Sequence, residues 1–328
     1  MIKYDVLSRL KNETDFISGE KISEDFGVSR AAVNLAVKAL RAEGYDIKSV
    51  TNRGYKLIKS PNVLNEGELM SYLSKERMGN VLCLEKVNST NIYLKEIAAE
   101  GADAGQVVLA DEQSAGRGRL GRRFLSPKGS GLYISYLMRP SVEAPESVSL
   151  TAHAAVAVAR AIKTVCGADC GIKWVNDLTL NKKKICGILT ELSVEAETGR
   201  IQNIVVGIGI NVNEKKGSFP AEIKDIATSL YSETGKKVSR AHLAAEVIKE
   251  LDVLAERNFK DMEAYLSDYR KMSVTIGKDI KVIKGDEVKA GKAVKINDDY
   301  TLKVEYDDGT KENLMAGEVS VRGLYDYT

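Results

Sequence analysis

Apolar residues recur with the spacing of α-helices through the first 45 residues of the chain. Ile2, Val6 and Leu10 share one face of a first helix. A later helix, from about Arg30 to Glu43, buries a face made by Val33, Val37 and Leu40. Residues 27–29, Gly-Val-Ser, form a short turn before that helix.

Beyond Gly44 the pattern changes from helical spacing to alternation of apolar and polar residues. The alternation runs on both sides of Asn52-Arg53-Gly54, which predicts a β-hairpin with a polar tip. Helix, turn, helix and hairpin in this order predict a winged helix-turn-helix over residues 1–60.

The C-terminal pattern consists of short alternating strands from Ile276 onward. Turns at Gly285, Asn297-Asp298 and Asp308-Gly309 separate them, which predicts a small β-barrel of about five strands over residues 276–328. The remaining residues, 61–275, begin at Pro61 and end where helical periodicity gives way to strand alternation near Val274.

Net charge is unevenly distributed among these three regions. The 48 Lys+Arg and 46 Asp+Glu give +2 overall, but residues 1–60 carry +3, the middle +1 and the last region −2. Residues 29–59 alone hold 7 basic and 2 acidic residues, so the second helix and the wing are the predicted DNA contacts. The predicted DNA-binding residues are Ser29, Arg30, Ala31, Asn34, Lys38, Arg53 and Tyr55. The alternative is a helical cap whose basic face is merely solvated.

Composition excludes several classes of protein. A hydrophobic fraction of 44% without a membrane-length apolar run predicts a folded chain that does not span a membrane. No signal sequence is apparent, so we expect a cytoplasmic location. Four cysteines without CxxC spacing and two histidines, His153 and His242, argue against a disulfide framework, a structural metal and a histidine-dependent triad.

Residues 116–123, GRGRLGRR, combine three glycines with four arginines. Glycine lets backbone N–H groups approach an anion closely, and guanidinium groups add paired hydrogen bonds. The segment is not a Walker A loop, and the glycines of 207–211, GIGIN, are not a Rossmann fingerprint. A flexible basic loop that binds nothing is the alternative for this segment taken alone.

A second polar segment is KWVND at 173–177, followed by a predicted hairpin around Asn181-Lys182. It places Asn176 and Asp177 at a strand end and Lys184 on the returning strand. Taken individually, such residues are usually turn or solvated positions, but their order along the chain is informative.

GRGRLGR at 116–122, KWVND at 173–177, the following KKICGIL and VVGIGINVN at 205–213 together resemble the signature segments of biotin protein ligases. The similarity extends to Asn88-Ser89-Thr90-Asn91 and Gln113. With the flanking regions, the whole chain resembles the bifunctional ligases that are also biotin-operon repressors. This family more often has proline where Val175 stands.

The resemblance implies an α+β fold in three domains. These are the winged helix-turn-helix of residues 1–60, a central class II synthetase-like ligase domain with a mixed sheet over 61–275, and an SH3-like small β-barrel over 276–328.

The resemblance also implies an ATP-dependent, AMP-forming ligase that forms a carbon–nitrogen bond. Biotin and ATP, with Mg²⁺, give biotinyl-5′-AMP, from which biotin passes to a lysine of a biotin carboxyl carrier protein. The implied catalytic residues are Lys184, Arg119 and Asp177, with Asp177 acting either on Mg²⁺ or on the acceptor lysine. Implied biotin-binding residues are Ser89, Thr90, Asn91, Gln113, Gly116, Arg117, Gly118, Arg119, Lys184, Gly187, Gly207 and Gly209. Implied ATP-binding residues are Arg119, Arg122, Asn176, Asp177, Asn211 and Arg322.

The implied partners are the carrier protein, operator DNA and a second copy of the chain. We expect the arginine-rich loop to order over the adenylate and so promote a homodimer through an edge strand of the central sheet. The rival interpretations are a lipoate-type acyl-adenylate ligase, a ligand-sensing repressor without turnover, and a ligase whose winged helix no longer binds DNA.

Overall fold

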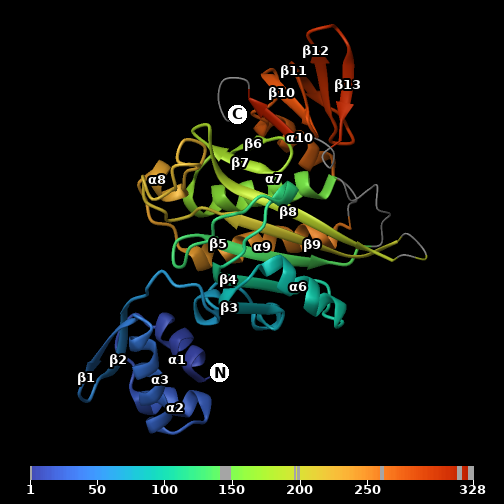
Figure 1. Ribbon diagram of the computed structural model, residues 1–328. Coiled ribbons are helices and arrows are strands. Elements are labelled where there is room, and N and C mark those ends of the chain that lie inside the picture. Colours follow the sequence, from blue (N-terminus) through green and yellow to red (C-terminus); the bar gives the residue numbers. More distant parts are fainter. Residues whose placement is uncertain are drawn as a thin grey trace.

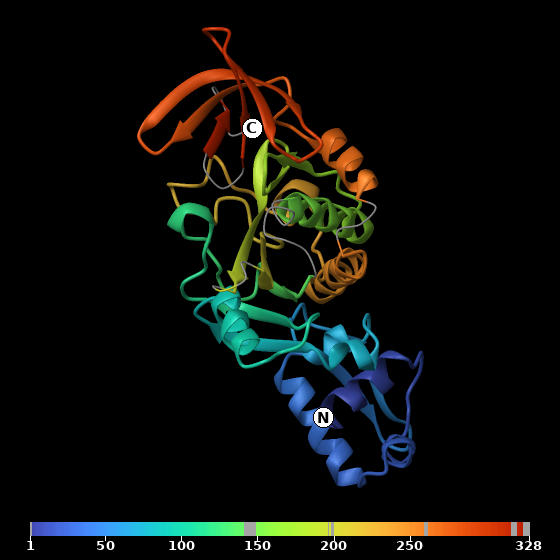
Figure 2. The ribbon, with the colours of Figure 1, turned by 90° about the vertical axis from the view of Figure 1, so that its right-hand side faces the viewer.

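The computed structural model describes residues 2–140, 149–195, 197, 200–258, 262–315 and 320–323, the last four by their backbone alone. Three parts follow one another along the molecule, with the N-terminal helices at one end and the C-terminal strands at the other (Figures 1 and 2). The predicted α+β organisation is confirmed by this arrangement and by the mixed central sheet described below. The domain boundaries at residues 60 and 275 stay predictions.

The N-terminal part is a three-helix unit with a β-hairpin. It comprises α1 (Ile2–Lys11), α2 (Gly19–Phe26), α3 (Arg30–Ala42), β1 (Asp46–Val50) and β2 (Gly54–Lys59). Ser18 and Ser29 cap α2 and α3 by accepting hydrogen bonds from backbone N–H groups, and Gly27 ends α2 in the left-handed conformation (φ 62°). These caps produce the predicted helix-turn-helix, and the paired strands form the predicted wing.

The central part is built on a seven-stranded sheet with the order β3-β4-β5-β9-β8-β7-β6. Its strands are β3 (Val81–Val87), β4 (Val107–Gln113), β5 (Leu132–Met138), β6 (Gly171–Lys173), β7 (Asp177–Leu180), β8 (Lys183–Val194) and β9 (Ile201–Ile210). β3 and β4 are parallel, and the other neighbouring pairs are antiparallel. The predicted β7–β8 hairpin turns at Asn181 and Lys182, both with positive φ.

Helices cover both faces of this sheet. α7 (Leu150–Cys166) and α9 (Arg240–Glu256) pack on the face that buries Val107 and Leu109. α6 (Thr90–Ala99) packs on the opposite face, which buries Val108. Because successive side chains of a strand point to opposite faces, the alternation along β4 shows that these two helix layers lie on opposite sides of the sheet. The shorter elements are α4 (Glu66–Leu69), α5 (Lys75–Met78), the 3₁₀ turn η1 (Arg119–Gly121), α8 (Leu230–Thr234) and α10 (Glu263–Met272).

The C-terminal part is a five-stranded antiparallel sheet with the order β13-β12-β11-β10-β14. Its strands are β10 (Asp279–Lys284), β11 (Glu287–Ile296), β12 (Leu302–Tyr306), β13 (Lys311–Leu314) and β14 (Ser320–Gly323). Trp174 fastens this sheet to the central part, because its backbone N–H donates to Thr275 Oγ1 (2.9 Å) and its indole N–H donates to the Tyr300 carbonyl (3.0 Å). The apolar core is accordingly continuous across the two parts.

The N-terminal unit is held against the central part by α1 and α4. Lys11 forms an ion pair with the buried Glu68 (2.7 Å), and Gly67 lies directly under Tyr4 and Leu7 of α1. The absence of a side chain at Gly67 therefore allows the two helices to meet.

We expect Gly67→Ala to lower the midpoint of thermal unfolding, because its new methyl group would lie 2.3 Å from the Tyr4 ring and 2.9 Å from Leu7. Such overpacking typically costs about 1–3 kcal/mol of unfolding free energy. Gly79→Ala is the matched control, since the Cβ would lie 3.2 Å from its nearest neighbour and the backbone is helical (φ −57°). Calorimetry that gives both variants the wild-type midpoint would contradict close packing of α1 on α4.

Candidate active site

A strip of glycines in the central sheet makes room for a pocket, which we call the first hollow. Gly187 of β8 lies opposite Gly209 of β9, and Gly207 is the next glycine along the same strand. The Phe124 ring covers the strip, since a Cβ on Gly209 would lie only 2.5 Å from it. The lining residues are Ser89, Thr90, Asn91, Gln113, Arg117, Gly118, Arg119, Phe124, Asn176, Lys184, Gly187, Ile188, Leu189, Gly207, Ile208 and Gly209.

One wall of the pocket is a chain of polar groups at the start of α6. The Thr90 N–H and hydroxyl both donate to Gln113 Oε1 (2.9 and 3.1 Å), and Gln113 Nε2 donates to Ser126 Oγ (2.8 Å). Ser89 precedes α6 without capping it through its side chain. The wall thus presents oriented donors and acceptors inside a largely buried hollow.

Asn91 is fixed beneath this wall by bonds in two directions. Its Oδ1 accepts from the buried Ser135 hydroxyl (2.5 Å), and its Nδ2 donates to Glu191 Oε2 (2.8 Å). Gly207 must be glycine for Asn91 to lie there, because a Cβ would stand 2.0 Å from Asn91 Oδ1.

The other end of the pocket collects charged groups. Lys184 Nζ lies 2.6 Å from Asp177 Oδ1, and Arg119 Nη1 donates to Asn176 Oδ1 (3.1 Å). Burial lowers the pKa of Arg119, while the nearby Asp177 carboxylate opposes that change. Two cations and one carboxylate therefore meet where the polar wall ends, at the junction of β6, β7 and β8.

The glycines of the arginine-rich loop allow it to fold back on itself. Gly118 N–H donates to the Arg122 carbonyl (2.7 Å), and a Cβ at Gly116 would lie 2.5 Å from the Phe124 carbonyl oxygen. Arg117 and Arg119 thereby line the pocket, whereas the exposed Arg122 and Arg123 do not.

A second hollow adjoins the first at Gln113. Leu125, Pro127, Phe219 and Pro220 give it apolar walls, and Asn211 lines it as well. Asn211 follows the end of β9, and its Nδ2 donates to the Thr228 carbonyl (3.0 Å). The two hollows together extend from the glycine strip to the segment that follows β9.

Most of the residues expected from sequence meet at these two hollows. Ser89, Thr90, Asn91, Gln113, Arg117, Gly118, Arg119, Asn176, Lys184, Gly187, Gly207 and Gly209 line the first. Asp177 and Gly116 touch lining residues. Arg122 lies outside the lining, Asn211 belongs to the second hollow, and the Arg322 side chain falls outside the described residues. Their roles stay predictions.

Sequence reasoning missed Phe124, Ser126 and Ser135. Phe124 and Ser126 follow directly on the arginine-rich loop, so a hairpin-like return of that loop would have indicated them. Apart from two tyrosines, Ser135 is the only residue of β5, LYISYLM, that carries a polar group. A buried hydroxyl in such a strand requires a partner and so indicates a polar site nearby.

The predicted DNA-contact face is exposed on α3 and the wing. Ser29, Arg30, Ala31, Asn34 and Lys38 are exposed along one side of α3. Asn34 Nδ2 donates to the Tyr55 hydroxyl (3.2 Å), which links the helix to the wing. Arg53 is exposed but forms an ion pair with Asp15 (3.1 Å) and lies over the Phe16 ring, so it must leave that pair to reach DNA. The Leu35 side chain, 66% exposed, joins this face without having been predicted.

The described residues contain no helix long and apolar enough to cross a membrane. Over the same part of the chain, no cluster of three or more His, Cys, Asp or Glu side chains could hold a metal ion.

Models of three protein families match successive parts of the chain. The model described as HTH domain matches residues 3–56. That of the Biotin/lipoate A/B protein ligase family matches residues 83–211, and that of the Biotin protein ligase C terminal domain matches residues 275–322.

Individual relatives match almost the whole chain. The bifunctional ligase/repressor BirA of Bacillus subtilis is 38% identical, over 94% of each chain. BirA of Escherichia coli is 32% identical, also over 94% of each. Among solved structures, the biotin protein ligase from Aquifex aeolicus in complex with biotin and ATP is similar with a TM-score of 0.64 and 31% identity. That similarity covers 74% of this chain and 99% of the other.

We expect Gly207→Ala to destabilise the central part, because its Cβ would displace Asn91 and leave the buried Ser135 hydroxyl with Thr90 Oγ1 (2.8 Å) in place of two partners. Overpacking of this kind typically costs about 1–3 kcal/mol of unfolding free energy. Urea unfolding measures the change. Gly187→Ala is the control, since its Cβ would lie 3.1 Å from the flexible end of Lys184 and at an ordinary contact distance of 3.6 Å from the Phe124 ring. Equal unfolding midpoints for the two variants would contradict this account of Asn91.

Proposed function

The chain belongs to the family of bifunctional biotin protein ligases and repressors, and we propose that the two adjoining hollows activate biotin with ATP and transfer it to a carrier lysine. The observation that carries this proposal is the position of Lys184, Asp177 and Arg119 at the end of a polar pocket. A carboxylate bound in that pocket would point at fixed positive charge.

We assign the biotin rings to the first hollow. The fused ureido group offers two N–H donors and one carbonyl acceptor, which suits the hydroxyl group of Thr90 and the amide group of Gln113 in the lining of this hollow. The apolar remainder would pack on the glycine strip and Phe124. A lipoyl chain lacks the ureido group and would leave the polar wall unpaired, which favours biotin over the lipoate-type alternative.

The first chemical step joins two anions. A carboxylate oxygen of biotin forms a bond to the α-phosphorus of ATP, while the bond from that phosphorus to the bridging oxygen breaks and pyrophosphate leaves. Lys184 and Arg119 are placed to offset the repulsion and to stabilise the charge that develops on the phosphoryl oxygens.

The second hollow is the proposed site of the adenosine. Its apolar walls at Leu125 and Phe219 suit a flat base, and Asn211 offers a polar group beside them. ATP binds proteins as its Mg²⁺ complex, which commonly uses one or two carboxylates together with the phosphates. Asp177 is the carboxylate beside the phosphate position, so it fits that task without a preformed metal cluster.

The second step transfers biotin to the carrier. The neutral amine of the acceptor lysine attacks the carbonyl carbon of biotinyl-5′-AMP, AMP leaves, and the amine gives up one proton. Asp177 either receives this proton or holds Mg²⁺, and its position beside Lys184 is compatible with either role. The other arginines of the loop would cover the anhydride against water.

The regulatory half of the proposal concerns a homodimer on operator DNA. The pairing of β8 with β7 stops at Gly187, whereas β8 continues to Val194. This longer part has an edge free of β7 and carries the exposed Leu192 and Val194. We propose that two copies pair along it when the adenylate is bound, which places two winged helices on a two-fold site. Both activities belong in the cytoplasm, where ATP and DNA are present.

The chemistry is tested by biotin-dependent exchange of labelled pyrophosphate into ATP. We expect Lys184→Ala to lower the exchange rate by about a hundredfold or more, as removal of a transition-state donor does in other enzymes. Lys183→Ala is the matched control, because Lys183 is the preceding lysine and donates to the Lys224 carbonyl at the surface. A rate for Lys184→Ala within threefold of the control would contradict the assignment, and exchange with lipoate instead of biotin would establish the rival ligase.

The regulation is tested by sedimentation and operator binding. We expect biotin with Mg²⁺ and ATP to strengthen both self-association and operator affinity in the wild type, because the adenylate orders the loop. In Lys184→Ala, these ligands should change neither self-association nor operator affinity. Identical monomer–dimer constants with and without ligands would contradict the coupling, and weak binding to every DNA sequence would indicate a winged helix without operator recognition.

A further inference from the structure

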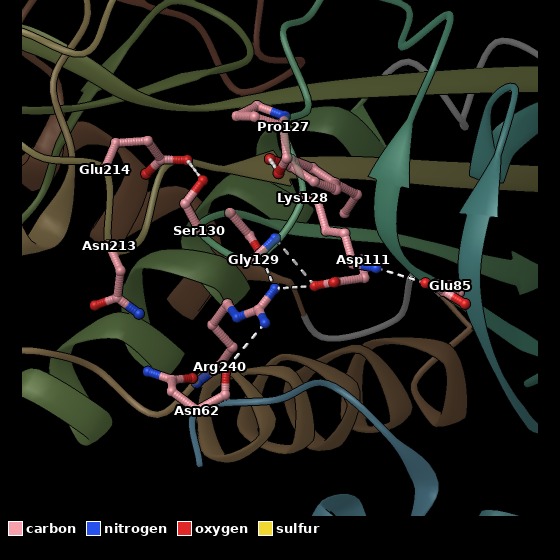
Figure 3. Close-up of polar contacts among 12 residues, drawn as sticks. Asn62, Glu85, Asp111, Pro127, Lys128, Gly129, Ser130, Asn213, Glu214 and Arg240 are labelled. Carbon is pink, nitrogen blue, oxygen red and sulfur yellow. Dashed lines mark hydrogen bonds and ion pairs between the residues drawn. The ribbon is translucent and has the colours of Figure 1, made fainter. Parts of the chain in front are cut away.

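Arg240, the first residue of α9, is a charged side chain in the interior of the central part. It is only 2% exposed, and its guanidinium has three oxygen partners (Figure 3). Nη1 donates to Asp111 Oδ1 (2.5 Å) and to the Gly131 carbonyl (3.2 Å), while Nη2 donates to the Asn62 carbonyl (3.0 Å). A buried charge is tolerated only with such partners, so the guanidinium fixes them relative to one another.

Two of these partners flank residues 112–130, which comprise the last two residues of β4 and the loop to β5 and which we call the substrate loop. Asp111 is in β4, two residues before Gln113, and Gly131 directly precedes β5. Asp111 Oδ1 also accepts from Gly129 N–H (3.3 Å). One buried guanidinium therefore closes the base of the loop that carries Gln113, Arg117 and Arg119.

The third partner belongs to the linker between the winged helix and the central part. Asn62 follows Pro61 and lies between β2 and α4. Its Oδ1 accepts from Arg240 N–H (3.1 Å), and its Nδ2 donates to the Val238 carbonyl (2.7 Å). The linker is thus hydrogen-bonded to Arg240, the residue that also closes the base of the substrate loop.

The segment after β9 reaches this junction as well. Asn213 exchanges hydrogen bonds with Val238 through its side chain (2.9 and 3.0 Å), and its N–H donates to the Ser130 carbonyl (2.9 Å). Figure 3 shows Asn213, Ser130 and Arg240 converging from three separate segments. The substrate loop borders the first hollow, and the segment after β9 borders the second. Both segments are therefore hydrogen-bonded to Arg240 or to Val238, two residues before it.

We propose that Arg240 is a positioning residue for biotin binding, and that through it the linker residue Asn62 sets the position of the substrate loop. The inference rests on the proposed assignment of the first hollow to biotin. Lysine in place of Arg240 keeps the charge beside Asp111, but a single ammonium cannot bond to three separated oxygens in these directions. Alanine in place of Asn62 removes only the side-chain attachment of the linker, at a distance from the pocket lining.

The test measures the dissociation constant of labelled biotin by equilibrium dialysis without ATP, and the KM and kcat for biotin in pyrophosphate exchange. We expect Arg240→Lys to weaken biotin binding at least fivefold and Asn62→Ala at least threefold. In both variants KM should rise more than kcat falls, in contrast to Lys184→Ala. Arg77→Lys is the matched control, because Arg77 also forms an ion pair that involves α9, with two bonds to Asp252 (2.8 and 3.0 Å), but does not bond to the loop.

A loss of thermal stability in Arg240→Lys and Arg77→Lys, with biotin affinity within twofold of wild type in both, would overturn the proposal and leave Arg240 a purely structural ion pair. If Arg240→Lys does not fold, Asn62→Ala and the isosteric Asp111→Asn carry the same expectation and the same contradiction. Biotin binding without exchange in the wild type would refute the proposed reaction but still allow the affinity comparison. A wild type that binds no biotin would refute both.

Discussion

The site must bring two negatively charged groups into contact, so positive charge has to be held in place before either arrives. We propose that Lys184 meets this demand, and its 2.6 Å pair with Asp177 orients it in a partly buried position. In the proposed reaction, the neighbouring Asp177 carboxylate either holds Mg²⁺ or receives the proton of the acceptor amine. The β7–β8 hairpin carries both residues, which makes the sheet the framework for the charge.

Other features of the central part follow from that placement. The glycines at 187, 207 and 209 clear the surface of β8 and β9 so that a ligand can lie against the strands and end at Lys184. The start of α6 and Gln113 add the polar wall, and the arginine-rich loop covers the hollow from the other side. Because Arg240 closes the base of the loop, the position of the loop depends on α9 and on the linker. The winged helix is thereby connected to the pocket through the linker that follows it and through the buried hydrogen bonds of Arg240.

Local patterns were sufficient to predict the winged helix, the β7–β8 hairpin and the residues that gather at the first hollow. Each depends on spacing between residues that are close in sequence, or on motifs whose order along the chain resembles that of a family. Contacts between distant segments could not be predicted in this way. Asn62 and Arg240 are 178 positions apart, and neither lies in a motif. Phe124 was overlooked because its role depends on the loop returning over the glycine strip, and the sheet order depends on long-range pairing that periodicity does not encode.

The central claim is that charge fixed around Lys184 drives formation of biotinyl-5′-AMP. The most direct measurement is native mass spectrometry of the protein after incubation with biotin, ATP and Mg²⁺ in the absence of a carrier. The account predicts a wild-type species that retains biotinyl-5′-AMP, together with a Lys184→Ala protein that retains unreacted biotin but little adenylate. A Lys184→Ala protein that accumulates the adenylate as fast as the wild type, or a wild type that forms none, would contradict it.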